Sequence, residues 1–118
     1  IRDVLGSRGL GDVYKRQATA LFIYTLAKAV NKGYIGKDYI QPTRKAFDGM
    51  VKTFTRLEED GSYTITNCCA VAGLGGDSKR YRDGSFEYYI SEPVIENDPK
   101  SVGSFILAAI EYEKMTDK

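Results

Sequence analysis

Ala18-Thr-Ala-Leu-Phe-Ile-Tyr-Thr-Leu-Ala-Lys-Ala-Val-Asn-Lys32 is the stretch that decides the fold class. Its apolar residues recur at spacings of three and four, which places them on one face of a helix: Phe22, Ile23, Leu26 and Val30. Much of the opposite face is also apolar, so this helix is expected to pack on more than one side. Gly33 follows directly and is suited to end the helix.

A second, longer helix is predicted from Gly36 to about Glu58. Pro42 lies in its first turn, where a missing backbone N–H does no harm. The predicted buried stripe consists of Tyr39, Ile40, Ala46, Phe47, Met50, Val51, Phe54 and Leu57. A turn at Glu58-Glu-Asp-Gly61 then ends the helix.

A third helix is predicted to begin at Asn97-Asp98-Pro99 and to end near Met115. Asp98 can cap the helix, and proline fits the first helical position. Its apolar face carries Val102, Phe105, Ile106, Ala109 and Ile110.

Two short strands are predicted between the second and third helices. Residues 62–67 alternate around Tyr63 and Ile65, and residues 85–90 place Phe86, Tyr88 and Ile90 on one face. The sequence therefore predicts a mainly α chain, with three helices plus a short β-hairpin. Its apolar faces are richer than so few helices can cover, which indicates a part of a larger helical body.

Composition excludes several classes of protein. The 118 residues suffice for one small domain, and 17 basic against 16 acidic residues give a net charge of +1. Such a balance gives no long-range reason for a nucleic-acid or membrane partner, and no apolar run approaches the roughly 20 residues of a membrane span. The chain has no histidine, which excludes a Ser-His-Asp triad, a Cys-His dyad and a histidine-bound zinc. The adjacent Cys68 and Cys69 are expected to be free or simply small buried residues.

Residues 1–17 are expected to stand apart from the domain. They show no period of 3.6 or 2, carry glycines at 6, 9 and 11, and lack the apolar core of a signal peptide. The stretch resembles translated adaptor sequence found at the ends of unrelated metagenomic reading frames. We therefore predict a non-native or disordered leader at 1–17 and the domain at 18–118; a natural flexible arm is the alternative.

The residues that suggest a binding site lie between 69 and 93. Gly73-Leu-Gly-Gly76 could cradle a phosphate, although a tight turn that needs positive φ angles explains the glycines more simply. Arg82 suits a carboxylate through two parallel hydrogen bonds, whereas a solvent-facing turn with local Arg82–Asp83 pairing is the alternative. Tyr88 and Tyr89 could stack on a sugar ring, or one of them could belong to the core.

No residue is identified as a catalytic acid or nucleophile. Glu87 and Glu92 are the carboxylates nearest the glycine loop, but neither has a context that marks it as an acid. Cys69 lacks a histidine base and is interpreted as a small buried residue.

Several motifs in fixed order resemble the C-terminal end of glycoside hydrolase family 105. They are Cys69-Ala-Val-Ala-Gly-Leu-Gly-Gly76, Tyr81-Arg-Asp-Gly-Ser85, Tyr88-Tyr-Ile-Ser-Glu-Pro93 and Asn97-Asp-Pro-Lys-Ser-Val-Gly103, and the opening Ala18-Thr-Ala-Leu-Phe22 also matches. The family comprises unsaturated rhamnogalacturonyl hydrolases and is related to the unsaturated glucuronyl hydrolases of family 88. The resemblance covers residues 18–115.

The resemblance implies the C-terminal part of an (α/α)6 barrel. It also implies the release of a 4,5-unsaturated uronic acid from pectin-derived rhamnogalacturonan oligosaccharides, by hydration of a vinyl ether double bond. It implies no metal or organic cofactor, and it is compatible with a cytoplasmic or periplasmic protein of bacterial origin.

The resemblance assigns no catalytic residue to this chain. The family's catalytic aspartates lie upstream of Ala18, so the chain is expected to be inactive alone. Arg82 and Tyr88 are the residues expected nearest the substrate cleft. The alternative is a non-enzymatic helical module that binds a carbohydrate or a protein.

Overall fold

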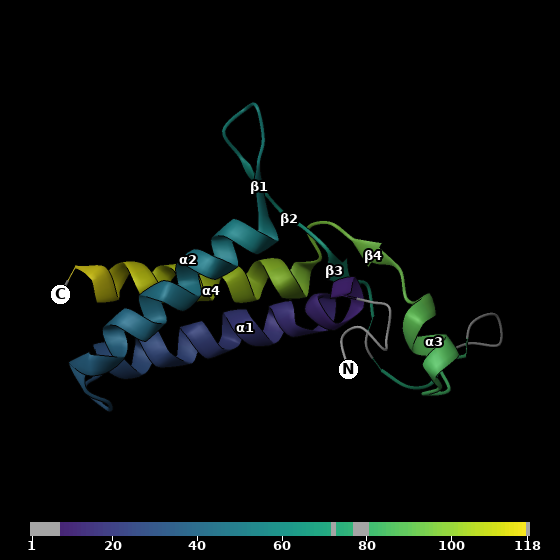
Figure 1. The fold of residues 1–118 in the computed structure, drawn as a ribbon, viewed down its shortest axis with the longest axis horizontal. Helices are drawn as coiled ribbons and strands as arrows, with labels where there is room; N and C mark the ends of the chain where they lie inside the picture. Colours follow the sequence, from purple (N-terminus) through teal and green to yellow (C-terminus); the bar gives the residue numbers. More distant parts are fainter. Residues whose placement is uncertain (1–7, 72, 77–80, 118) are drawn as a thin grey trace.

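Three helices form the body of the molecule (Figure 1). The computed structural model describes residues 8–71, 73–76 and 81–117, with the backbone alone for residues 8–16. The body consists of α1 (Arg8–Asn31), α2 (Ile40–Phe54) and α4 (Pro99–Thr116). A single 3₁₀ turn, η1 (Lys37–Tyr39), precedes α2. Helices α1 and α4 run side by side in the same direction, and α2 runs antiparallel to both.

The first helix begins ten residues before the predicted start and ends at Asn31, one residue before the predicted end. Its early turns fall within the predicted leader, of which residues 1–7 lie outside the described part; the foreign origin of that leader stays a prediction. At the other end Gly33 has a φ of 75°. The Gly33 N–H donates to the Val30 carbonyl (3.0 Å) and the Tyr34 N–H to the Ala29 carbonyl (2.8 Å). This pair of bonds satisfies the last carbonyls of the helix and confirms the predicted stop.

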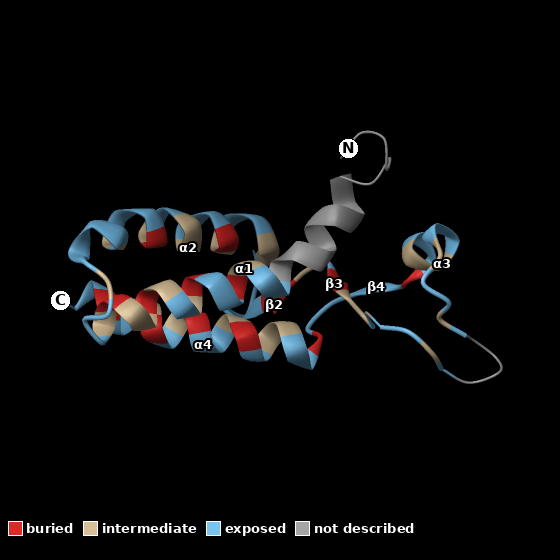
Figure 2. Ribbon diagram, turned by 90° about the horizontal axis from the view of Figure 1, so that it is seen from below, coloured by how far each residue is buried: buried red, intermediate tan, exposed pale blue. Residues whose placement is uncertain are grey.

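Small residues let α1 and α4 approach closely. Ala20 and Ile23 of α1 pack with Met50 of α2 and with Ala108 of α4, which is fully buried. A second cluster joins Ala27 and Val30 of α1 to Met115 of α4. Figure 2 shows these buried positions along the line where the helices meet. The core therefore lies along the contact between the helices, and the outer faces of the helices are exposed.

The second helix is shorter than predicted. It ends at Phe54, and residues Thr55–Leu57 form strand β1, which pairs antiparallel with β2 (Tyr63–Ile65). Leu57, predicted in the buried stripe, is 62% exposed. Pro42 does lie in the first turn of α2, as predicted.

The predicted strand at 85–90 is wrong, because these residues form a short helix, α3 (Phe86–Ser91). The Ser85 side chain accepts a hydrogen bond from the Tyr88 N–H (3.1 Å), which caps the helix and outweighs the β preference of its aromatic residues. The predicted short β-hairpin is present, but β2 pairs with β1 instead of with a strand at 85–90. A second antiparallel pair joins β3 (Cys68–Cys69) to β4 (Val94–Ile95).

The predicted start of the last helix is confirmed. The Asp98 carboxylate accepts hydrogen bonds from the backbone N–H groups of Lys100 (3.1 Å) and Ser101 (3.4 Å), and Pro99 occupies the first position. The helix ends at Thr116, one residue beyond the predicted end.

The segment between β3 and β4 projects from the helical body (Figure 1). We call residues 73–76 and 81–93 of this segment the α3 lobe. The radius of gyration is 16.4 Å, whereas a compact domain of this length would have about 13 Å.

Of the described helices, none is long and apolar enough to cross a bilayer.

Candidate functional site

A β-bridge shapes the base of the α3 lobe. Gly75 and Arg82 exchange two backbone hydrogen bonds, of 2.9 and 2.8 Å. Gly75 and Gly76 have φ angles of 85° and 124°, which favour glycine. Leu74 packs over Gly84, where a side chain would meet the leucine at 3.0 Å. This bridge fixes the backbone of Arg82.

A chain of local hydrogen bonds positions Tyr88. The Asp83 carboxylate accepts from the Ser85 N–H (2.8 Å), and hydrogen bonding from Ser85 holds the pKa of Asp83 below its usual range. Ser85 in turn caps α3 at Tyr88. The alternative interpretation of this segment as a solvent-facing turn fits the backbone, in which Gly84 has a φ of 79° and the Asp83 carboxylate accepts from Ser85.

The structure brings Arg82, Tyr88 and Glu92 together, a group that we call the Arg82–Tyr88 cluster. Burial raises the pKa of the Tyr88 phenol, the Glu92 carboxylate raises it further, and the positive charge of Arg82 acts against both. The Tyr88 hydroxyl faces Glu92 and the Gly73 backbone, but neither contact has the geometry of a formed hydrogen bond. The Arg82 Nε is also buried and has no partner among the described residues. Among the described residues, the Arg82 Nε and the Tyr88 hydroxyl of this cluster therefore have unused hydrogen-bonding capacity.

The other candidate residues of the lobe are placed separately. Glu87 is exposed on α3, whereas Glu92 is only 6% exposed and lies next to Tyr88. Tyr89 is half-buried near Cys69, and burial raises the pKa of its phenol. The strand prediction had placed Tyr88 and Tyr89 on opposite faces; on a helix they are about 100° apart instead.

The phosphate-cradle interpretation of Gly73–Gly76 is wrong. Gly75 lies in the β-bridge to Arg82, and the first described helix after the loop, α3, begins only at Phe86, so among the described residues the loop does not open a helix N-terminus. Both cysteines are free, as expected; Cys68 is buried and the Cys69 thiol donates to the Val71 carbonyl (2.9 Å). Among the described residues no group of His, Cys, Asp or Glu is arranged to hold a metal ion.

A polar hollow of about 400 Å³ between α1 and α4 was not predicted. Asn31 donates to the Glu111 carboxylate at 2.9 Å, and this bond, aided by the charges of Lys114 and Lys28, lowers the pKa of Glu111. Two parallel helices end at this hollow, where the side chains of Lys28, Lys32 and Lys114 lie. Their positive charges interact favourably with the negative ends of the two helix dipoles. The electrostatics of helix ends explain this group of lysines, and no sequence motif predicts it.

A known protein family matches most of this chain. The model of Glycosyl Hydrolase Family 88 matches residues 12–116. The chain belongs to glycosyl hydrolase family 88. Two curated relatives, Protein Atu3128 of Agrobacterium fabrum and a 24.9 kDa protein in the picA locus of Rhizobium radiobacter, are each 36% identical over 113 residues.

A solved structure extends the likeness to family 105. A glycoside hydrolase of family 105 from C. acetobutylicum is 41% identical and superposes with a TM-score of 0.69 over 80% of this chain. This family member is a helical barrel, so the predicted fold class is confirmed. The chain spans 48% of the length of the curated relatives and 26% of the family 105 structure.

Proposed function

We propose that this chain forms the C-terminal part of a glycoside hydrolase that removes 4,5-unsaturated uronic acid from pectin-derived rhamnogalacturonan oligosaccharides. Family membership supports glycoside hydrolysis and a carbohydrate substrate. The observation that carries the finer proposal is the Arg82–Tyr88 cluster, in which the Arg82 charge acts on the Tyr88 phenol and the Arg82 Nε is buried without a described partner.

Arg82 is proposed to bind the substrate carboxylate. A guanidinium binds a carboxylate through two parallel hydrogen bonds, and the Nε donor of Arg82 is buried without a described partner. An unpaired buried donor costs free energy, so an acceptor supplied by the substrate would relieve that cost. Tyr88 is proposed to present its ring to the sugar, with its neutral hydroxyl as a donor.

The catalytic acid is proposed to lie outside this chain. In the proposed reaction an aspartate protonates the vinyl ether double bond, water adds to the resulting cation, and the hydrated sugar opens and is released. Asp83 is occupied by Ser85, and its lowered pKa keeps it ionised, which is unsuited to a general acid. We therefore propose that the 118-residue chain has no hydrolase activity alone.

The proposal is tested in the C. acetobutylicum relative carrying residues 18–117 of this chain in place of the segment it matches. Hydrolysis is followed as the loss of ultraviolet absorbance of the unsaturated uronate. Arg82→Ala should raise KM for an unsaturated rhamnogalacturonan disaccharide at least about tenfold, because a charge-assisted pair contributes about 1.5–3 kcal/mol. Tyr88→Ala should also raise KM, whereas Tyr88→Phe should retain ring stacking.

Arg44→Ala is the matched control, since it removes an arginine from α2 in the helical body. If Arg82→Ala and Arg44→Ala have equal KM values, Arg82 does not bind the substrate carboxylate. Turnover by the isolated 118-residue chain would refute its proposed inactivity.

A further inference from the structure

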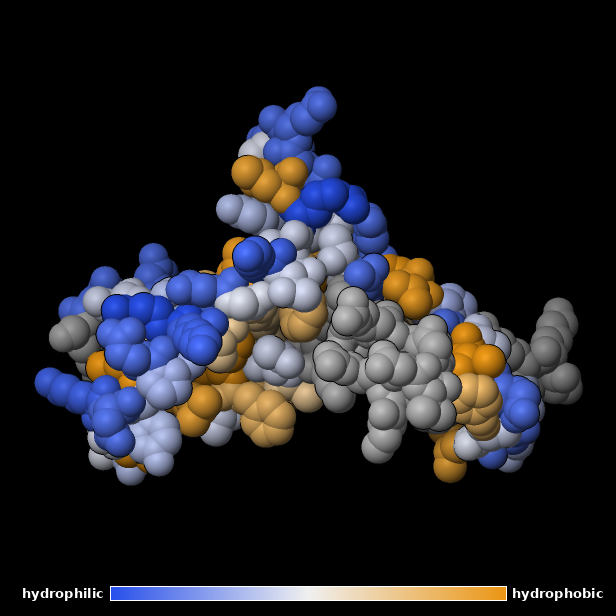
Figure 3. All heavy atoms as spheres, in the orientation of Figure 1, coloured by the Kyte–Doolittle hydropathy of each residue, from blue (hydrophilic) through white to orange (hydrophobic). Residues whose placement is uncertain are grey.

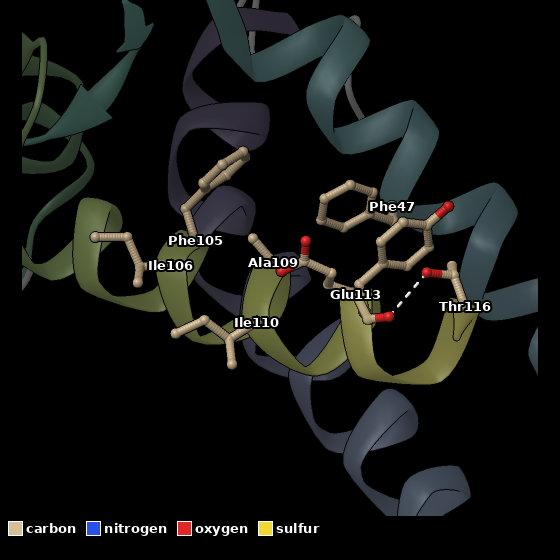
Figure 4. Close-up of a pocket in the computed structure, with 8 residues that line it drawn as sticks. Phe47, Phe105, Ile106, Ala109, Ile110, Glu113 and Thr116 are labelled. Carbon is tan, nitrogen blue, oxygen red and sulfur yellow. Dashed lines mark hydrogen bonds between the residues drawn. The ribbon is translucent and has the colours of Figure 1, made fainter. Parts of the chain in front are cut away.

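The α3 lobe buries a charged side chain and exposes its apolar ones. Glu92 is the only buried residue of the lobe among those that the structure describes, whereas Leu74, Tyr81 and Phe86 are each more than half exposed. The helical body shows the usual order instead: apolar side chains line most of its hollow of about 470 Å³ between α2 and α4, and Glu113 at this hollow is exposed (Figure 4). A buried carboxylate is costly unless cations or hydrogen-bond donors face it, so the burial of Glu92 needs a physical reason.

Two other carboxylates are buried in the described chain, and the helices account for both. Asp98 caps α4, and Glu111 accepts a hydrogen bond from Asn31 and forms an ion pair with Lys114 (3.6 Å). Glu92 is instead the C-cap residue of α3, where a negative charge meets the negative end of the helix dipole. Helix capping therefore does not explain why Glu92 is buried.

Glu92 faces the hydroxyl of Tyr88. Residues 88 and 92 are one helical turn apart, so their side chains lie on the same side of α3. The Tyr88 hydroxyl is buried and has no formed hydrogen bond among the described residues. Burial raises the pKa of the Tyr88 phenol most and Glu92 raises it further, whereas the Gly73 backbone lowers it, which is the effect of a donor that faces the phenol oxygen. The hydroxyl therefore lies between a donor and an anionic acceptor that together can fix its direction.

We propose that Glu92 is a positioning residue for Tyr88: its carboxylate accepts a hydrogen bond from the Tyr88 hydroxyl and so orients the ring that is presented to the sugar. The inference rests on the proposed function of Tyr88 and names the group that receives its hydroxyl proton. A tyrosine ring is rigid, so an acceptor at its hydroxyl restricts the plane in which a sugar can stack. The exposed apolar side chains of the lobe offer little packing that could hold the ring in its place.

The kinetic test uses the C. acetobutylicum relative carrying residues 18–117 and measures KM for the unsaturated disaccharide. Glu92→Ala should raise KM about fivefold, the effect of losing one hydrogen bond, and Glu92→Gln should restore most of this loss because it keeps an acceptor oxygen. In a Tyr88→Phe background Glu92→Ala should cause no further change, since the hydroxyl through which it acts is gone. Glu87→Ala removes an exposed carboxylate from the same helix and is the control, with KM within about twofold of the parent.

A second measurement needs no substrate, so it separates this proposal from the proposed function. The pKa of Tyr88 in the same protein is followed by carbon-13 NMR of its ring, with the signal assigned by its absence from Tyr88→Phe. Glu92→Gln removes an anion that opposes formation of the phenolate, so the pKa of Tyr88 should fall. Glu87→Gln should leave this pKa unchanged.

Three outcomes would overturn the proposal or divide it from the proposed function. If the effects of Glu92→Ala and Tyr88→Phe on KM multiply in the double variant, Glu92 has a structural role instead. If the effect of Glu92→Ala disappears in an Arg82→Ala background but persists in Tyr88→Phe, Glu92 acts through Arg82. If Tyr88→Ala leaves KM unchanged while Glu92→Gln still lowers the pKa of Tyr88, the proposed function of Tyr88 fails but its contact with Glu92 stands; an unchanged pKa overturns the contact itself.

Discussion

Removing the Asp98 carboxylate should destabilise the helical body by more than a typical surface substitution does. Asp98 is 4% exposed and accepts from two backbone N–H groups at the start of α4. Helix α4 packs along α1 more extensively than any other pair of elements, so fraying of its first turn reaches the core seam. We therefore expect Asp98→Ala to act on global unfolding.

The magnitude follows from three contributions. Loss of an N-cap costs about 1 kcal/mol, and loss of a negative charge at a helix N-terminus costs about 0.5 kcal/mol. The ion pair of Asp98 with the Lys100 Nζ (2.9 Å) adds little, because the lysine side chain is 55% exposed and screened by solvent. The sum is about 1.5–2 kcal/mol, or a fall in Tm of about 6–8 °C for a domain of this size.

The assay is thermal and urea unfolding followed by far-ultraviolet circular dichroism. Asp98→Ser retains a capping oxygen without the charge and should lose only about 0.5 kcal/mol. Asp117→Ala, an exposed aspartate at the C-terminal end of the same helix, is the control and should have almost no effect. If Asp98→Ala unfolds within about 0.5 kcal/mol of the wild type, the cap does not stabilise α4 as argued.

Three further outcomes are expected. Ile23→Ala should cost about 3 kcal/mol in urea unfolding, because Ile23 is 1% exposed in the core; a cost below about 1 kcal/mol would contradict that packing. Hydrogen bonding from Thr64 lowers the pKa of Glu58, so this stabilisation is present above the unfolded pKa and lost as the pH falls below about 4. Thr64→Val should reduce the loss of unfolding free energy as the pH falls below about 4. An unchanged loss would show that the Thr64–Glu58 hydrogen bond is not its cause. A thiol reagent should label the half-buried Cys69 in the native state and Cys68 only after unfolding, which mass spectrometry of timed samples would check.

The elements predicted correctly are those with local signals. Asp98 and Pro99 define the start of α4 through contacts within three residues, and Gly33 ends α1 through its own backbone conformation. The turn at 58–61 was also predicted, and Asp60 holds it by accepting from Ser62. The predicted helix before this turn is too long, because residues 55–57 form strand β1 instead. The pairing of β1 with β2 joins residues up to ten apart in sequence, and helical periodicity cannot reveal such a contact.

The error at α3 explains what was missed at the site. Helix α3 has only six residues, which is too few for a helical period to be recognised among its aromatic side chains. The sequence signal for this helix was the capping segment Asp83-Gly84-Ser85 before it. On an extended strand residues 88 and 92 would lie about 13 Å apart, but one helical turn brings them to about 6 Å. The residue types identified Arg82 and Tyr88 as candidates, while the proximity of Glu92 to Tyr88 depends on the helix.

The helical body and the α3 lobe are stabilised by different means, and this separates global stability from the proposed binding by Arg82 and Tyr88. Figure 3 shows apolar side chains exposed on the α3 lobe, where Leu74 is 74% and Phe86 51% exposed. Little packing is therefore available to hold the lobe, and its geometry depends on the Gly75–Arg82 bridge and the Ser85 cap. Substitutions in the α1–α4 seam should then change unfolding without redirecting Arg82. Substitutions at the bridge or cap should change ligand affinity at little cost in global stability, because neither feature contributes to the helical core.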